Sequence, residues 1–492
     1  MKKGFDNQKY LKLQKENILK RIKSFENKLY LEMGGKLFDD LHASRVLPGF
    51  EPDVKIKLLT SLKDKAEIII CISANDIERN RIRADLGLSY DDEVLRLIDS
   101  FRNLGLLVSS IVITLFKGQS SAQKFATKLE RRGEKVYFHQ YTKGYPTDVD
   151  TIVSDEGYGA NPYIKTTRPL VVVTAPGPAS GKLATCLSQM YHEYKQGIKA
   201  GYAKFETFPV WNLPLKHPVN VAYEAATADL KDINMIDSYH FNKYGTLTVN
   251  YNRDLEVFPV LKNILRKITG KDIYNSPTDM GVNMVGFAIS DNNACEAASK
   301  EEIVRRYYRY RCDYKKGNIS IDTVDRVQML MNELELSREY LPIIPFAKKV
   351  SKESGFPAIA LELPNKKIIA GKTKNLISAS GAVILNALKT LAKIDDNICL
   401  ISDEILRPIL ALKINVLKSK SSILSLDDVL IALAICAKTD PIAKKCMDQL
   451  PKLKSCNAHS TYILSASDEN TLKKLGINIT SEPHFETNNL FI

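Results

Sequence analysis

Residues 170–190 read LVVVTAPGPASGKLATCLSQM, and this stretch carries the strongest structural signal in the chain. It begins with an apolar, β-branched run over 170–174, which is typical of a buried strand. A turn rich in proline and glycine follows, and Ser180-Gly181-Lys182 then opens a segment with helical spacing. A strand, a glycine-containing loop and a helix in this order predict a loop that holds phosphate at the helix N-terminus.

This loop differs from a standard P-loop at two positions. The standard pattern has Gly five residues before its second Gly and Ser or Thr after its Lys, whereas Pro176 and Leu183 stand in these places. Leu183 has no oxygen and therefore cannot ligate magnesium. The backbone N–H groups of the loop can still bind a phosphate, whatever side chains they carry. A strand-to-helix turn that binds nothing is the alternative.

Strands and helices alternate regularly through the first two hundred residues. Strand-like runs are expected over 28–33, 66–73, 109–116, 135–141 and 170–175. Helical patterns are expected over 52–64, 92–104, 119–132 and 182–197. Strands that alternate with helices form a parallel sheet covered on both faces, and ligands collect at the carboxyl ends of its strands. The sequence therefore predicts a doubly wound α/β domain over residues 1–201.

A second loop rich in polar residues follows the first expected strand. Gly34-Gly35 precedes KLFDDLHASR, which contains Asp39, Asp40, His42 and Arg45. This order is similar to the entry loop of nucleotidyltransferases with the HUP version of the doubly wound fold, although its spacing is one residue longer. A glycine turn before a polar helix start is the alternative. The fold is thus predicted as P-loop-like or HUP-like, with ligand-binding residues Gly34, Gly35, Gly177, Ser180, Gly181, Lys182 and Leu183.

Two further regions follow the expected sheet. Polar motifs are dense over 202–320, and this middle region is expected to pack on the first domain and complete its site. The tail over 321–492 has amphipathic helical patterns and short strands, so it is predicted to form a separate α+β domain. Its expected helices are 322–337, 380–393, 402–413 and 426–438, and its expected strands are IALEL, KIIAG, TYILS and INIT. The LPNKK turn between the first two of these strands predicts a hairpin.

The middle region supplies candidates for metal binding, proton transfer and charge stabilisation. Asn250-Tyr251-Asn252-Arg253-Asp254 and Asp279 adjoin apolar runs, and polar groups held against a core must be hydrogen-bonded. They indicate either a structural network or a site, and a solvated helix face is the alternative for Asp237. For the arginine in the 300–311 motif, the alternative is the basic outer face of a core helix. The candidate catalytic residues are Asp237, Asp254, Asp279, Arg253 and Arg305.

Composition restricts the class of protein. The net charge of +13 comes from Lys and Arg spread along the chain, which fits an anionic ligand as well as a solvated surface. The chain has no apolar run of membrane-spanning length, and its eight cysteines include no CxxC pair. Cys71 and Cys436 lie in apolar runs, so reduced thiols in a cytoplasmic protein are expected. Neither a membrane nor a nucleic acid is the expected partner.

Several motifs together resemble one bacterial family of about this length. They include DEGYGANPYI (155–164), VVVTAPGPASGK (171–182), SPTDMGVNM (276–284) and CNAHSTYILS (456–465), and the likeness covers nearly the whole chain. The family carries no established activity and was once labelled an ATP-dependent peptidase. A zinc peptidase of the zincin type needs a second His four residues after the first, and Gln196 stands there after His192-Glu193. The resemblance implies the architecture but no reaction.

These patterns favour a cytoplasmic enzyme that binds ATP or another phosphorylated ligand. Phosphoryl or nucleotidyl transfer to a small molecule is the expected chemistry, so an ATP-dependent transferase is the working hypothesis. Magnesium is compatible with it, but its ligands would have to lie outside the loop, and Asp237, Asp254 or Asp279 could serve either magnesium binding or proton transfer. A non-catalytic nucleotide-binding sensor or scaffold is the alternative. Either protein could work as a homo-oligomer.

Overall fold

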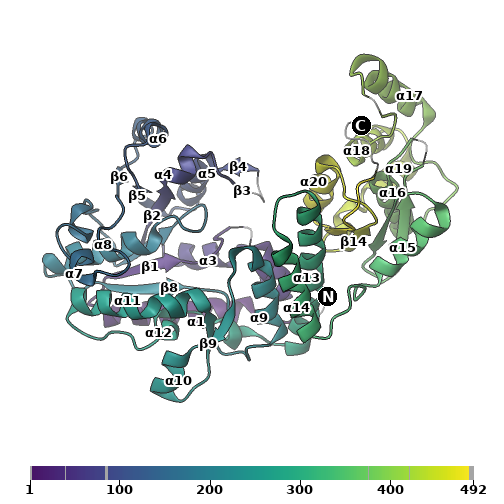
Figure 1. Cartoon of the computed structure of the whole chain (residues 1–492). Helices are drawn as coiled ribbons and strands as arrows, with labels where there is room; N and C mark the ends of the chain where they lie inside the picture. Colours follow the sequence, from purple (N-terminus) through teal and green to yellow (C-terminus); the bar gives the residue numbers. More distant parts are fainter. Residues whose placement is uncertain (1–2, 39, 84–86, 375, 420, 487–492) are drawn as a thin grey trace. The chain divides into compact units, whose positions relative to one another are not determined.

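The computed structural model describes residues 3–38, 40–83, 87–374, 376–419 and 421–486. Asp39, a polar residue of the second loop, lies outside the described residues. The chain forms two compact units, Met1–Ser299 and Lys300–Ile492 (Figure 1). The three-part division at residues 201 and 320 stays a prediction.

The first unit is built on a seven-stranded parallel sheet. Its strand order is β11-β8-β1-β7-β2-β5-β6, and each neighbouring pair is parallel. The strands are β1 (Leu29–Met33), β2 (Ala66–Ser73), β5 (Leu107–Thr114), β6 (Val136–Phe138), β7 (Leu170–Thr174), β8 (Gly201–Phe205) and β11 (Gly281–Val282). All five strands expected from the sequence are present, and the α/β class is confirmed.

Two strands of this sheet had no clear signal in the sequence. β8 reads GYAKF, and its glycine and lysine interrupt the apolar run that marks a buried strand. β11 has two residues. β8 pairs with β1 from Leu29–Gly201 to Met33–Phe205, so residues beyond 201 belong to the same sheet.

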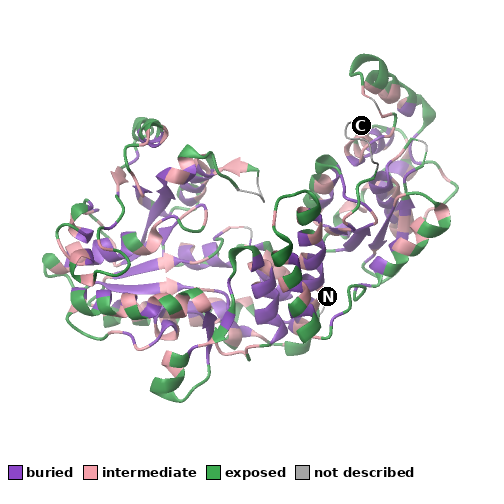
Figure 2. Cartoon of the chain, viewed as in Figure 1, coloured by how far each residue is buried: buried purple, intermediate pink, exposed green. Residues whose placement is uncertain are grey.

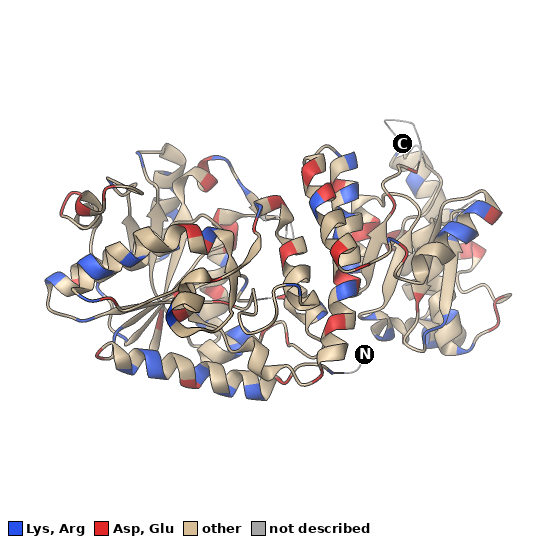
Figure 3. Cartoon of the chain, turned by 60° about the horizontal axis from the view of Figure 1, so that its bottom comes forward, with Lys and Arg blue, Asp and Glu red and all other residues tan. Residues whose placement is uncertain are grey.

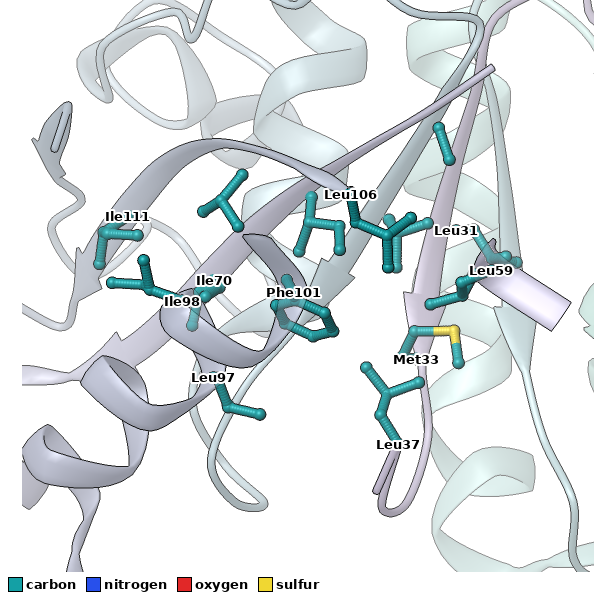
Figure 4. Packing of buried hydrophobic residues seen from close by; sticks show 14 of the residues in the cluster. Leu31, Met33, Leu37, Leu59, Ile70, Leu97, Ile98, Phe101, Leu106 and Ile111 are labelled. Atoms are coloured by element: carbon teal, nitrogen blue, oxygen red, sulfur yellow. The ribbon is translucent and has the colours of Figure 1, made fainter. Parts of the chain in front are cut away.

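Helices cover both faces of the sheet. Leu31 and Met33 of β1 enter a core formed with α1 (Asn7–Ser24), α3 (Val54–Thr60), α5 (Tyr90–Asn103) and α6 (Ser120–Arg131). Figure 4 shows both side chains near Leu59 of α3, with Phe101 of α5 farther along the same core. Tyr30 enters the opposite core with α7 (Val149–Ile152), α8 (Lys182–Lys195) and α11 (Asn252–Thr269). The alternation of side chains along each strand thus produces two cores, and the strands between them are mostly buried (Figure 2).

β1 and β7 are neighbours in the sheet, and the chain leaves them toward opposite faces of the sheet. After β1 it passes through α3, on the first face, to β2. After β7 it passes through α8, on the other face, to β8. Such a reversal opens a crevice at the carboxyl ends of the two strands, where open α/β sheets bind their ligands. The topology therefore places both sequence-predicted loops at a switch point.

Smaller elements complete the first unit. Two pairs of short strands are antiparallel: β3 (Ile82–Arg83) with β4 (Leu88–Ser89), and β9 (Asn234–Ile236) with β10 (Val249–Tyr251). The short helices are α2 (Leu41–Val46), α4 (Ala74–Glu78), α9 (Pro218–Ala226), α10 (Ser238–Tyr244) and α12 (Pro277–Met280). The long helix α13 (Asn292–Lys315) contains the boundary between the two units.

The second unit has a mixed sheet in the order β13-β12-β14-β15. β12 (Ala358–Glu362) and β13 (Ile368–Lys372) form the expected hairpin, and β14 (Asn457–Ser460) pairs in parallel with β15 (Asn478–Ser481). The expected strand at TYILS is wrong: the strand lies just before it, because this apolar run leads into the N-cap Ser465 of the last helix. The helices are α14 (Ile321–Glu333), α15 (Ile343–Ser354), α16 (Ala379–Ala392), α17 (Asp403–Ala411), α18 (Leu426–Cys436), α19 (Pro441–Met447) and α20 (Ala466–Lys474).

The surface carries charges of both signs. Figure 3 shows Lys and Arg interspersed with Asp and Glu over the helices of both units. The eight cysteines are free, and Cys399 alone among them is exposed. Over the described residues, no helix combines the length and the apolar character that crossing a membrane requires.

Candidate functional site

The loop between β7 and α8 is a compact turn held from two sides. Ala179 and Gly181 have left-handed backbone, with φ of 57° and 77°. The Ser180 hydroxyl donates a hydrogen bond to the carbonyl of Gly177 at 3.0 Å. The Thr114 hydroxyl, at the end of β5, donates to the carbonyl of Ser180 at 2.8 Å. The turn is therefore fixed both by its own side chains and by a strand two positions along the sheet.

Close packing explains both glycines of this loop. A β-carbon on Gly177 would lie 2.3 Å from the hydroxyl oxygen of Tyr90, and one on Gly181 would lie 2.8 Å from Cβ of Thr114. Contacts this short do not occur between real side chains, so any larger residue would displace the loop. The glycines thus allow the loop to lie directly against β5 and α5.

The N-terminus of α8 offers unpaired donors and a cation. In the described part of the chain, the N–H groups of Gly181, Lys182 and Leu183 have no protein acceptor, and no side chain caps the helix. Likewise, no acidic partner for the half-buried Lys182 ammonium is found among the described residues. Free N–H groups at a helix start favour an anion, because the helix dipole adds to their partial charge.

The Leu183 side chain packs against the core on one side of α8. It is partly buried and packs against the core cluster that contains Tyr30, Cys186 and Leu187. It therefore contributes to the packing of α8 on the sheet, and it supplies no oxygen for a metal ion.

The Gly34-Gly35 loop opens at the same edge of the sheet as the loop after β7. β1 and β7 pair in parallel, so both loops leave the carboxyl end of the same sheet. A β-carbon on Gly34 would lie 2.8 Å from the carbonyl oxygen of Phe205, and Gly35 has φ of 69°. Both positions therefore need glycine for backbone reasons, as the glycine-turn alternative requires.

Asp40 and His42, which the HUP-like pattern singled out, have internal partners. Asp40 accepts a hydrogen bond from the buried Lys55 ammonium at 2.7 Å and caps α2 through the N–H of Ala43. Burial opposes ionisation, but Lys55 outweighs it and lowers the pKa of Asp40 below its ordinary value. The His42 ring lies against the ring of Tyr223, with centroids 5.3 Å apart. This set therefore stabilises the segment after β1.

An ionic cluster lies at the carboxyl ends of β1 and β8. The Lys204 ammonium is 2.6 Å from a carboxylate oxygen of Glu206 and 2.6 Å from one of Asp254. Glu32 is the neighbour of Lys204 in the strand register, and its carboxylate accepts a hydrogen bond from Tyr202 at 2.8 Å. Three carboxylates therefore surround one ammonium, which leaves the cluster with excess negative charge when all are ionised.

The cluster also shifts the proton affinities of its members. Burial would lower the pKa of Lys204, but Asp254 and Glu206 raise it above its ordinary value. Burial raises the pKa of Glu206, and Lys204 only partly opposes this. Carboxyl groups with raised pKa values serve as proton donors and acceptors near neutral pH, and they concentrate at functional sites.

The ionic cluster and the start of α8 share a neighbour. The charges of Glu32 and Lys182 both act on the buried Cys186 thiol, whose pKa is raised, mainly by burial and next by Glu32, while Lys182 opposes the rise. Both α8 and α11 cover this face of the sheet, and Asp254 lies in the first turn of α11. The N–H groups at the start of α8 and the carboxylates thus belong to one region of the first unit.

Two of the predicted catalytic residues, Arg253 and Asp254, lie in the first turn of α11, where Asp254 joins the ionic cluster around Lys204. Arg253 is more than half exposed and lies 3.4 Å from a carboxylate oxygen of the buried Asp232. Its guanidinium is therefore oriented by Asp232 while remaining accessible.

Asp237 and Asp279 belong to a second network, around α10 and α12. Asp237 is fully buried, caps α10 through the N–H of His240 and accepts from the Thr278 hydroxyl at 2.6 Å. Asp279 accepts from the Tyr244 hydroxyl at 3.0 Å. Hydrogen bonds within the protein use the oxygens of both carboxylates, so the network fixes α10 and α12.

Arg305 belongs to the second unit and has acidic partners there. It is almost buried and contacts Glu302 at 2.9 Å, Glu301 at 3.2 Å and the side-chain oxygen of Asn457 at 3.0 Å. The network ties α13 to β14.

The His192-Glu193 pair of the peptidase motif is used internally. A ring nitrogen of His192 lies 2.7 Å from the carbonyl oxygen of Asn161, and the buried Glu193 accepts from the Tyr30 hydroxyl at 2.7 Å. Among the described residues, no group of three or more His, Cys, Asp or Glu side chains is arranged to hold a metal ion.

Sequence reasoning missed Glu32, Lys204 and Glu206. The signal was present in KFE at 204–206, where two charges of opposite sign lie two residues apart and share one face of a strand. Recognising it requires β8 to be identified as a strand first. The contact of Lys204 with Asp254, fifty residues on, depends on the tertiary fold.

Two family models match the chain. One, described as the N-terminal part of the domain of unknown function DUF1846, matches residues 3–335, and the other, described as its C-terminal part, matches residues 339–491. A protein of Clostridium tetani (strain Massachusetts / E88) is 56% identical over 500 aligned positions, which cover 100% of this chain and 99% of the relative. A protein of Clostridium botulinum (strain ATCC 19397 / Type A) is 57% identical with the same coverage. Both relatives are named UPF0371 protein.

Proposed function

The chain belongs to the DUF1846 family, and from this premise we propose that its first unit binds ATP or another phosphorylated ligand and acts as a cytoplasmic phosphoryl or nucleotidyl transferase. Family membership assigns no reaction, so the proposal rests on geometry. The observation that carries it is the start of α8, where unpaired N–H groups and the Lys182 ammonium adjoin a switch point of the sheet. In this sense the loop would act as a P-loop.

The ionic cluster gives the proposal its chemical part. Glu206, whose raised pKa suits proton transfer, would take the proton of an acceptor hydroxyl, while the Lys204 ammonium, 2.6 Å from both Glu206 and Asp254, would hold these carboxylates in place. Arg253 is accessible and oriented, so it would stabilise charge that develops on the transferred phosphate. If magnesium takes part, its ligands would come from this cluster and from the phosphates, since Leu183 offers none.

Calorimetric titration with ATP, with and without magnesium, tests the binding step. Replacing Lys182 by Ala removes a charge-assisted contact, so ATP affinity should fall roughly ten- to a hundredfold. Lys195→Ala is the matched control, because Lys195 lies on the same helix but pairs with Asp155 at the protein surface. Equal ATP affinity in the wild type and Lys182→Ala would mean that the loop is only a turn.

A non-catalytic nucleotide-binding sensor is the second candidate function. The packing of Leu183 favours it, because the position that usually ligates magnesium serves the core instead. Turnover separates the two candidates: a transferase should release ADP or pyrophosphate from ATP, and Glu206→Gln should slow this release without weakening ATP binding. Tight binding without turnover, in the presence of a broad set of hydroxyl and amine acceptors, would favour the sensor.

A further inference from the structure

A hollow opens at the carboxyl edge of the sheet, beyond the loop that follows β7. It has a volume of about 340 Å³ and is lined by Phe116, Lys117, Gly118, Gln140 and Tyr141. These residues follow β5 and β6, so the hollow lies at the same edge as the start of α8. We propose that this Phe116–Tyr141 hollow binds the base of a nucleoside phosphate whose phosphates lie at the start of α8. This inference rests on the proposed phosphate site.

The two sites are physically connected. Thr114, which donates to the carbonyl of Ser180, lies two residues before Phe116 in the same chain segment. Neighbouring strands are about 4.8 Å apart, so β5 lies about 10 Å from β7 across the sheet. A ligand that fills both sites therefore needs a phosphate at one end, a flat ring at the other and a spacer of about this length. A nucleoside di- or triphosphate has this form, whereas a sugar phosphate has no flat ring.

The size of the hollow fits part of a ligand. Sites for complete small molecules occupy about 300–1,000 Å³, so a hollow at the lower limit suits a ring system rather than an entire nucleotide. The remainder of the ligand would cross the open edge between the hollow and the start of α8.

The lining has the chemistry that a base requires. The half-exposed Tyr141 offers an aromatic face, on which every base can stack, and Phe116, whose ring packs on Phe138 with centroids 4.3 Å apart, forms an apolar wall beside it. The Gln140 side-chain amide and the Lys117 ammonium have no partners within the described residues, so they are available to the polar edge of a base.

Hydrogen bonds hold the backbone on both sides of the hollow. The N–H of Phe116 donates to the carbonyl of His139 at 3.0 Å, which continues the ladder between β5 and β6. The N–H of Gln140 donates to the side chain of Asn161 at 2.8 Å, and the Tyr141 hydroxyl donates to the carbonyl of Tyr145 at 3.2 Å. A preorganised site loses less entropy when it binds, which favours recognition.

Calorimetric titration of the full chain with ATP, GTP and inorganic tripolyphosphate tests the proposal. ATP or GTP should bind more tightly than tripolyphosphate, and Tyr141→Ala should remove roughly tenfold of the nucleotide affinity while leaving tripolyphosphate binding unchanged. Tyr141→Phe keeps the ring but loses the hydrogen bond to the Tyr145 carbonyl, so it should retain most of the wild-type affinity. Tyr340→Ala, at an exposed tyrosine of the second unit, is the matched control.

The outcomes distinguish this inference from the proposed function. If nucleotides and tripolyphosphate bind equally and Tyr141→Ala changes neither, while Lys182→Ala weakens both, the phosphate site stands and the base site is wrong. If none of the three probes binds, or if Lys182→Ala has no effect on any of them, the phosphate site fails and the base site fails with it.

Discussion

Thr114 Oγ1 lies 2.8 Å from the carbonyl oxygen of Ser180 and donates a hydrogen bond to it, so β5 holds the turn that follows β7. Thr114 is buried, and the same hydroxyl lies 3.4 Å from the carbonyl of Ile72. One side chain thus joins two strands of the sheet, β5 and β2, to the loop at the start of α8.

Thr114→Val should test how firmly this contact holds the loop. Valine has nearly the same shape but no hydroxyl, so the Ser180 carbonyl would lose its donor and the free energy of unfolding should fall by about 1–2 kcal/mol. Urea denaturation measures the change. Thr127→Val, at an exposed site on α6, is the control and should change it far less. Equal stability of Thr114→Val and the wild type would show that the loop holds its conformation unaided.

Gly177→Ala should destabilise the protein through a steric clash. The added methyl group would overlap the Tyr90 ring, and relieving such overpacking typically costs about 1–3 kcal/mol. Gly281→Ala is the matched control, because its new methyl group would meet its nearest neighbour at an ordinary 3.4 Å. Thermal unfolding of both variants should show a lower midpoint for Gly177→Ala. Identical midpoints would contradict the packing of Tyr90 against the loop.

Leu183→Thr should lower stability instead of creating a working magnesium ligand. Leu183 packs against the core, so the change removes apolar contacts and places a hydroxyl among them, at a cost of about 1–3 kcal/mol. Leu183→Met preserves volume and should cost less. Chemical denaturation compares the two variants. A gain in magnesium-dependent ATP affinity, with no loss of stability, would show that this side chain faces the phosphates.

His139 should make the first unit less stable in mild acid. It is buried, and burial lowers its pKa to about 4, from an ordinary 6.5. Between pH 6.5 and about 4, His139 is therefore protonated in the unfolded chain but neutral in the folded one. The free energy of unfolding thus falls as the pH drops below 6.5. The loss should reach about 2 kcal/mol by pH 5.

Denaturation of His139→Gln between pH 7 and 5 checks this prediction. The variant should lose less stability over that interval than the wild type does. His484→Gln, at an exposed histidine, should behave as the wild type. If His139→Gln and His484→Gln show the same pH dependence, folding does not change the pKa of His139, and the prediction is wrong.

The parallel sheet could be predicted because its signals are local. β2 is largely apolar, and its bounds agree residue for residue with the expected strand at 66–73, while β7 ends at the turn that Pro176-Gly177 predicts. Strand propensity and turn chemistry act within a few residues, so sequence alone reveals them. β8 gave no such signal, because the charged Lys204, which pairs with Asp254, interrupts its apolar residues.

The candidate site could be predicted only where one segment supplies it. The start of α8 lies in one stretch, so its N–H groups and Lys182 could be identified together. The Lys204–Asp254 contact joins a strand to a helix of the same unit, and nothing in either segment indicates the other. The sequence predicted Arg305 as a candidate for charge stabilisation. In the structure, Glu301 and Glu302, one turn earlier on α13, bind its guanidinium.

The position of β7 between β1 and β2 has a consequence for synthesis on the ribosome. Leu170 pairs with Leu29 on one side and with Ala66 on the other, so the first strands to emerge cannot pair with each other and wait for a segment made much later. Until then they present open edges that favour aggregation. We expect nascent chains that end before β7 to need a chaperone and to be cut readily by protease, whereas chains that extend beyond β8 should resist it. Equal resistance in stalled chains of both lengths would show that the early strands find another arrangement first.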